Sequence, residues 1–222
     1  MRRPWPVWVH TDDALAHVGR SLRRYHYVVA AFVPPQGAFW RTSRRPWQPG
    51  DIIGHNDSAP YNAVWQDGNR NPVDVLGGVR GRLVGFVDWD LATPVPSLLD
   101  LAYMAFGWVP LHDRDVVAAE GFTHFGDRPR RLQLLRDAYG YQGDIDALLD
   151  EVRTRVMQHA AGIRELTAAG DPLLSRLIRL GFIDGLNRAL AKWLWLHVSI
   201  HSYLPRWAST APVKSVVGGA WG

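Results

Sequence analysis

The chain of 222 residues contains no cysteine. This absence excludes disulfide bonds, thiolate metal sites and a cysteine nucleophile. It also fits a protein that stays in a reducing compartment, so we predict a cytoplasmic location. Hydrophobic residues make up 47% of the sequence, which is enough to bury a sizeable core without covalent cross-links.

Long apolar runs are also missing. No segment reaches the roughly 18 to 20 consecutive apolar residues that are needed to span a bilayer. The first six residues, MRRPWP, lack the apolar stretch of a signal peptide. We therefore expect no membrane partner.

Lysine is scarce, since only Lys192 and Lys214 occur in the chain. The formal net charge is +4, from 25 basic and 21 acidic residues, and the arginines lie among the acidic residues. Nucleic-acid-binding proteins gather basic side chains on one face. Nucleic acid is therefore not an expected partner, and a basic nucleic-acid binder is the least favoured of three functional alternatives.

Apolar periodicity predicts an α+β protein that is mainly helical. Apolar residues recur every three or four positions after Thr11, which with two aspartates offers an N-cap and a favourable charge. Short β-branched and aromatic runs indicate strands before the helical second half. The predicted elements are a helix at 12–33, strands at 52–53, 63–65 and 83–87 with the last two paired, and helices beginning at Asp127, Asp144 and Asp171, the last running unbroken toward Trp195.

Three polar motifs lie around the predicted strands. They are Gly54-His55-Asn56-Asp57-Ser58-Ala59-Pro60-Tyr61-Asn62, Val87-Asp88-Trp89-Asp90 and Leu99-Asp100-Leu101-Ala102. The first has the pattern H-x-D-x-x-x-x-N, which places a carboxylate to receive a proton and an amide to hold a metal ion. The second supplies a further carboxylate, so the set indicates phosphoryl transfer.

In this order and spacing, the motifs resemble the catalytic half of the aminoglycoside phosphotransferase and choline kinase family, which has a protein-kinase-like fold. The resemblance covers Trp5 to about Leu196. It implies a C-terminal lobe in which a small β-hairpin carries the catalytic and metal loops. The implied organisation is a lobe at 1–197, containing a first helix at 12–33, loops at 52–102 and a helical acceptor region at 103–197, followed by an irregular tail at 198–222.

The resemblance also implies roles for individual residues. Asp57 is the expected catalytic residue, which takes the proton of an acceptor hydroxyl. Asn62 and Asp88 are the expected Mg²⁺ ligands, because this hard cation prefers oxygen donors. His55 and Asp100 are expected to support the loop, Asp100 by tying its backbone together, and the proton of His55 is not expected to enter the chemistry.

Each of these residues also has a simpler interpretation. Asp57 could cap a turn, Asn62 could be an ordinary loop amide, and Asp88 could cap a strand end. Asp90 is a candidate for supporting the metal ligands or touching substrate, although a structural role is favoured for it. Asn56 stands where the family usually has glycine, and asparagine tolerates the left-handed backbone that glycine would adopt there.

The segment before His55 lacks two parts of such a kinase. No glycine-rich G-x-G-x-x-G loop occurs there, and both lysines come far downstream. In this type of enzyme those parts hold the nucleotide. We therefore expect an absent N-terminal nucleotide lobe, weak binding of Mg-nucleotide, and an exposed face that is a candidate for self-association.

The predicted function is a phosphotransferase that moves the γ-phosphate of ATP or GTP to a hydroxyl of a small molecule, impaired by the missing lobe. The alternative is a non-catalytic remnant or a ligand- or partner-binding module. The acceptor stays open among aminoglycosides, choline-like compounds, sugars and macrolides, because a fold does not fix a function. Candidate carboxylates for an acceptor pocket are Asp144, Asp146, Asp150 and Glu151.

Overall fold

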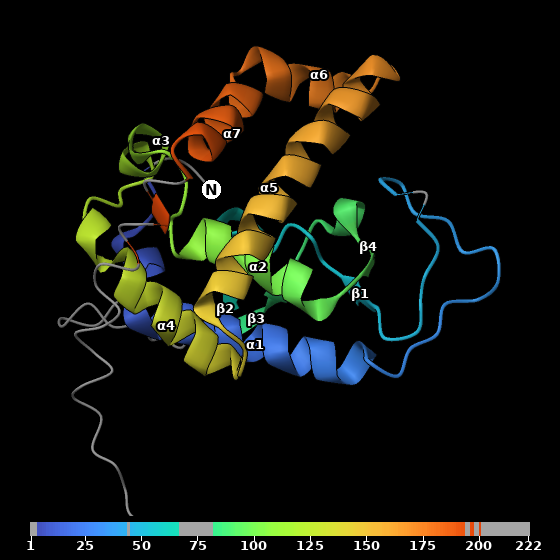
Figure 1. Ribbon diagram of the computed structural model, residues 1–222, viewed down its shortest axis with the longest axis horizontal. Coiled ribbons are helices and arrows are strands. Elements are labelled where there is room, and N and C mark those ends of the chain that lie inside the picture. Colours follow the sequence, from blue (N-terminus) through green and yellow to red (C-terminus); the bar gives the residue numbers. More distant parts are fainter. Residues whose placement is uncertain (1–3, 44, 67–81, 194–195, 198–199, 201–222) are drawn as a thin grey trace, which may run out of the picture.

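The computed structural model describes residues 4–43, 45–66, 82–193, 196, 197 and 200. This part of the chain is mainly helical with two small antiparallel sheets, which confirms the predicted α+β class (Figure 1). The helices are α1 (Asp12–Val29), α2 (Ser97–Trp108), α3 (Arg114–Ala119), α4 (Arg128–Tyr139), α5 (Ile145–Ala168), α6 (Pro172–Arg179) and α7 (Phe182–Ala191). The strands are β1 (Ile52–Gly54), β2 (Ala63–Gln66), β3 (Arg82–Phe86) and β4 (Thr93–Val95).

Helix α1 begins where the sequence predicts but ends earlier. The Thr11 hydroxyl accepts a hydrogen bond from the backbone N–H of Ala14 at 3.2 Å, as an N-cap should. The helix ends at Val29, short of the predicted residue 33. Phe32 and Val33 are exposed, so further turns would bury no apolar surface, and the Pro34-Pro35 pair disfavours helix just before it.

The two sheets are small, and only one of them was predicted. Strands β2 and β3 pair as expected, with Ala63 opposite Phe86. Strand β1 pairs with β4, which places Gly54 opposite Thr93, and this pairing was not predicted. The connection from Gln66 to Arg82 is rich in Gly, Asn and Pro, which predicts an exposed and mobile segment. Its residues 67–81 lie outside the described residues, as does the predicted tail at 198–222 except for Ile200.

Helix α2 lies at the centre of the core. It packs against the long helix α5, while α1 packs against α4 (Figure 1). Arg131 of α4, which is almost fully buried, donates hydrogen bonds to the carbonyls of His10 at 2.7 Å and Trp108 at 2.9 Å. This guanidinium satisfies the carbonyls that end the 3-10 turn Val7–His10 and helix α2, and so fixes α4 against both.

The last predicted helix is broken into two. Helix α6 ends at Arg179 and α7 starts at Phe182, because Gly181 adopts a left-handed backbone with φ of 75°. Helices α6 and α7 pack against each other, and both pack on α5 (Figure 1). Within the described ranges, none of the helices combines the length and apolarity that crossing a membrane requires.

Glycine is required at position 54 by close packing. A Cβ added there would lie 2.5 Å from Val95 Cγ2 and 3.2 Å from the Asp100 side chain. We expect Gly54→Ala to lower the free energy of unfolding by about 1–3 kcal/mol, since overpacking forces the backbone to shift. Urea denaturation measures this loss.

Gly85→Ala is the matched control in the other sheet, because nothing lies within 4 Å of its added Cβ. It should leave the free energy of unfolding unchanged or slightly raised. Equal losses in the two variants would contradict the packing explanation.

Candidate functional site

A buried carboxylate holds the loop that follows β1. Asp100 of α2 accepts hydrogen bonds from the backbone N–H groups of His55 at 3.0 Å and Asn56 at 2.7 Å, and from His26 Nε2 at 2.9 Å. Burial works to raise the pKa of Asp100, but the hydrogen bond and charge of His26 and the two loop amides outweigh it and leave this pKa below its ordinary value. Asp100 is therefore an ionised anchor.

Further contacts fix the backbone of the same loop. Asn56 has a left-handed φ of 62°, as expected for asparagine at a glycine-like position. Arg155 of α5 donates to the Asn56 carbonyl at 2.7 Å, and Trp108 Nε1 of α2 donates to the Ser58 carbonyl at 2.8 Å. The backbone of the loop is thus held from two helices.

His55 links this loop to the end of β3. Its Nε2 donates to the Val87 carbonyl at 3.0 Å, and its Nδ1 accepts from the Asp57 N–H at 3.2 Å. A carbonyl only accepts, so the proton of the neutral ring is on Nε2. The imidazole therefore uses both nitrogens within the scaffold.

Asp57 is the carboxylate that this scaffold presents. Its Oδ1 accepts from the Tyr61 hydroxyl at 2.7 Å, and its Oδ2 accepts from Asn62 Nδ2 at 2.9 Å. Burial raises the pKa of Asp57 above its ordinary value of 3.8, although hydrogen bonds from Tyr61, Tyr103 and Asn62 act against it. The ionised carboxylate is therefore poorly solvated, and any further hydrogen-bond donor would stabilise it.

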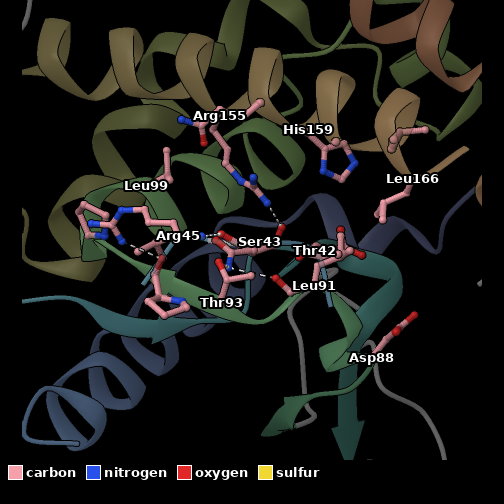
Figure 2. Close-up of a pocket in the computed structure, with 18 of the residues that line it drawn as sticks. Thr42, Ser43, Arg45, Asp88, Leu91, Thr93, Leu99, Arg155, His159 and Leu166 are labelled. Atoms are coloured by element: carbon pink, nitrogen blue, oxygen red, sulfur yellow. Dashed lines mark hydrogen bonds between the residues drawn. The ribbon is translucent and has the colours of Figure 1, made fainter. Parts of the chain in front are cut away.

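A cavity of about 780 Å³ opens beside Asp57 (Figure 2). Its lining mixes apolar and polar side chains. The apolar ones come from β4, α2, α5 and α7 and include Val95, Leu99, Ile163, Leu166 and Phe182. The polar ones include Asp57, Tyr61, Asp88 and Thr93. An amphiphilic small molecule or a segment of a peptide fits such a cavity.

Arg155 and His159 project from α5 over this cavity (Figure 2). Burial, followed by the charge of Arg155, lowers the pKa of His159 to about 3, so its imidazole is neutral at physiological pH. Arg155 is half-buried and lies between the Asn56 carbonyl and the Tyr103 ring, whose centroid lies 5.2 Å from its Cζ. Of these two side chains of α5, only the guanidinium therefore brings a positive charge to the cavity.

The two predicted aspartates after β3 lie in different places. Asp88 is exposed, has a left-handed φ of 65°, and lines the rim of the cavity apart from Arg155 and His159 (Figure 2). Asp90 does not line the cavity and instead pairs with Arg41, which also binds Asp171 at 2.8 Å. This pairing ties the segment before β1 to the start of α6.

The metal-ligand roles of Asn62 and Asp88 stay predictions. Asn62 directs its amide nitrogen, not its oxygen, at both the carboxylate and the backbone carbonyl of Asp57, each at 2.9 Å. Among the residues that the structure describes, no three His, Cys, Asp or Glu side chains gather closely enough to hold a metal ion. Binding of Mg²⁺ with ATP or GTP stays a prediction.

Of the four candidate acceptor carboxylates, Glu151 lines the cavity, whereas Asp144 caps α5.

Several other residues of this site were not predicted from the sequence. Tyr61 was inside the predicted motif, and its position four residues after Asp57 was the available signal. Arg155 and His159 lie on α5 about a hundred residues away, so no local pattern could have assigned them to this loop.

The chain is similar to a protein that is named for immunity. The chain is 30% identical over 139 residues to a trifolitoxin immunity protein of Rhizobium leguminosarum bv. trifolii. These residues are 62% of this chain and 46% of that protein, so the chain spans less than half of its relative's length. No protein family matches the chain, and no solved structure does.

These comparisons contradict the resemblance drawn from the motifs. The assignment to the aminoglycoside phosphotransferase and choline kinase family is wrong, and so is the predicted phosphotransferase function, because no such family matches and the relative is named for immunity. A kinase-like lobe is likewise not shown. The physical reason is that the motif residues brace a loop: His55 and Asp100 use their polar atoms on its backbone, which requires no phosphate chemistry.

The perturbed carboxyl of Asp57 leads to a prediction about its titration. Carbon-13 NMR should show Asp57 titrating above 3.8, and Tyr61→Phe should raise this pKa further by removing a hydrogen bond to the ionised form. Because the folded pKa exceeds the unfolded one, Asp57 should lower stability progressively as pH rises from 3.8 through its folded pKa.

Tyr27→Phe is the control for this titration, since Tyr27 is exposed on α1 and makes no contact with Asp57. It should leave the pKa of Asp57 unchanged. A pKa at or below 3.8 in the unmodified protein would contradict the desolvation described here.

Proposed function

We propose that this protein confers immunity: it protects a cell from a toxic compound by binding that compound in the cavity beside Asp57. The observation that carries the proposal is the 30% identity, over 62% of this chain, to a protein named for immunity to trifolitoxin. The cavity supplies the physical means. Its volume of about 780 Å³ lies within the range of sites that enclose small molecules.

The mixed lining of the cavity favours an amphiphilic ligand. Burial of apolar groups of the ligand against Leu99, Leu166 and Phe182 would supply most of the binding free energy. A hydrogen-bond donor of the ligand would meet Asp57, whose carboxylate has lost much of its hydration. A charge-assisted hydrogen bond is stronger there than in water, so this contact would orient the ligand.

The rigidity of the loop supports binding as the mode of protection. The backbone that carries Asp57 is hydrogen-bonded to Asp100, Trp108 and Arg155 before any ligand arrives. A preformed site loses less conformational entropy on binding than a mobile one.

Other expectations from the sequence stay predictions. They are the small-molecule hydroxyl acceptor, the absence of nucleic-acid and membrane partners, self-association and the cytoplasmic location.

Growth protection tests this proposal. The chain is expressed in a toxin-sensitive strain, which is challenged with trifolitoxin, and the inhibitory concentration should rise. Gly162→Phe should abolish the protection, because Gly162 lines the cavity and its added Cβ meets nothing within 4 Å, so the ring can enter the ligand space without a clash at Cβ. Asp57→Asn should weaken protection by about tenfold, which corresponds to the loss of one charge-assisted contact.

Met157→Phe on the same helix is the matched control, since Met157 is exposed and does not line the cavity. It should protect as well as the unmodified chain. Failure of the unmodified chain to protect, at an expression level confirmed by immunoblot, would contradict the function. Full protection by Gly162→Phe would contradict the assignment to this cavity.

A further inference from the structure

A second, smaller cavity lies at the other end of α7. It has a volume of about 340 Å³, and α7 connects it to the first cavity, since Phe182 lines the first and Ala189 the second. Its apolar lining comes from Leu111, Ala189 and Leu196. The charges around it differ from those of the first cavity and are predominantly positive.

Arg128 is the least usual side chain of this second cavity. The residue is 4% exposed, and its Nη2 donates to the His112 carbonyl at 2.8 Å. Its Nε has no hydrogen-bond partner among the residues that the structure describes, which is costly for a buried charged donor. Burial, followed by the charge of Arg114, lowers the pKa of Arg128 to about 10, with Asp113 acting in the opposite direction.

Two guanidinium groups share one aromatic ring here. Arg114 Cζ lies 5.1 Å and Arg128 Cζ lies 5.2 Å from the centroid of Phe125. The ring attracts each cation, but the like charges repel each other. This arrangement becomes more favourable when an anion lies between or beside the two groups.

The carboxylate at this cavity is already used by other cations. The Asp113 side chain, 1% exposed, accepts from Lys192 Nζ at 2.8 Å and from Arg188 Nε at 3.0 Å. The hydrogen bond from Lys192 is the main reason that the pKa of Asp113 lies below its ordinary value. Of the described residues that line the cavity, three therefore carry a fixed positive charge and one a carboxylate.

We propose that this cavity is a second ligand site, which takes a small carboxylate with an apolar chain. The guanidinium groups suit a carboxylate, because their planar N–H donors match its two oxygens. The apolar lining suits the chain of the ligand, which a hydrated inorganic anion does not offer. The site is independent of the cavity beside Asp57 and of the immunity function.

An NMR titration of the full chain tests this site with hexanoate as the probe. Hexan-1-ol is the uncharged analogue of the same chain, and inorganic phosphate is an anion without a chain. Hexanoate should cause saturable shifts of the backbone amides near Asp113 and Ala189. Both comparison compounds should bind at least about tenfold more weakly, a difference of about 1.4 kcal/mol.

Arg114→Gln should weaken hexanoate binding by about tenfold or more, and it should leave the fold intact because Arg114 is exposed. Arg130→Gln is the matched control, since Arg130 lies on α4 near Arg128 but pairs with Asp12 outside the cavity. It should leave hexanoate binding unchanged. Equal affinity for hexan-1-ol or phosphate, no saturable shift with hexanoate, or equal weakening by the two variants would overturn the proposal.

Discussion

The buried carboxylate of Asp100 is the constraint on which the rest of the site depends. It has no exposed surface, and an unpaired charge in such a place would be prohibitively costly. Its three donors come from His26 on α1 and from the backbone of His55 and Asn56 after β1. His26 is held in turn by the Tyr139 hydroxyl of α4 at 2.7 Å, so one charge connects three helices with the loop.

This anchoring explains why Asp57 is presented in an unfavourable environment. The loop cannot turn to hydrate the carboxylate, because Arg155 and Trp108 hold its carbonyls while Asp100 holds its amides. Tyr61 and Asn62 replace only part of the lost hydration, and the pKa stays raised. The poorly solvated carboxylate of Asp57 thus offsets part of the stability that the other hydrogen bonds of the loop provide, as is common in binding sites.

The parts of the fold that follow from local sequence were predictable. Thr11 and Asp144 cap helices, and Gly140 ends α4 in a left-handed conformation with φ of 80°. Strands β2 and β3, which are consecutive in the sequence, pair with each other. The break at Gly181 was missed because the apolar period continues on both sides of it. Strand β4 was missed because three residues that include a proline give no strand pattern.

Only those residues of the site that lie within one short stretch of sequence were predictable. The motif drew attention to a loop in which the side chains of Asp57 and Asn62 contact one another, while the roles predicted for them stay predictions. It did not indicate that Arg155, His159 and Phe182 would close the cavity, because tertiary packing of α5 and α7 brings them there. Short motifs specify how a loop is braced, and this is why they led to the wrong family.

Amide hydrogen exchange of His55 and Asn56 tests the anchoring role of Asp100 most directly. In Asp100→Asn, one loop N–H must face an amide NH₂ group, so these two amides should lose about tenfold or more of their protection relative to core amides of α5. Asp51→Asn removes another buried carboxylate, which Arg45 and Gln48 hold away from this loop, and it should not change these two amides. Unchanged protection of His55 and Asn56 in Asp100→Asn would contradict the account.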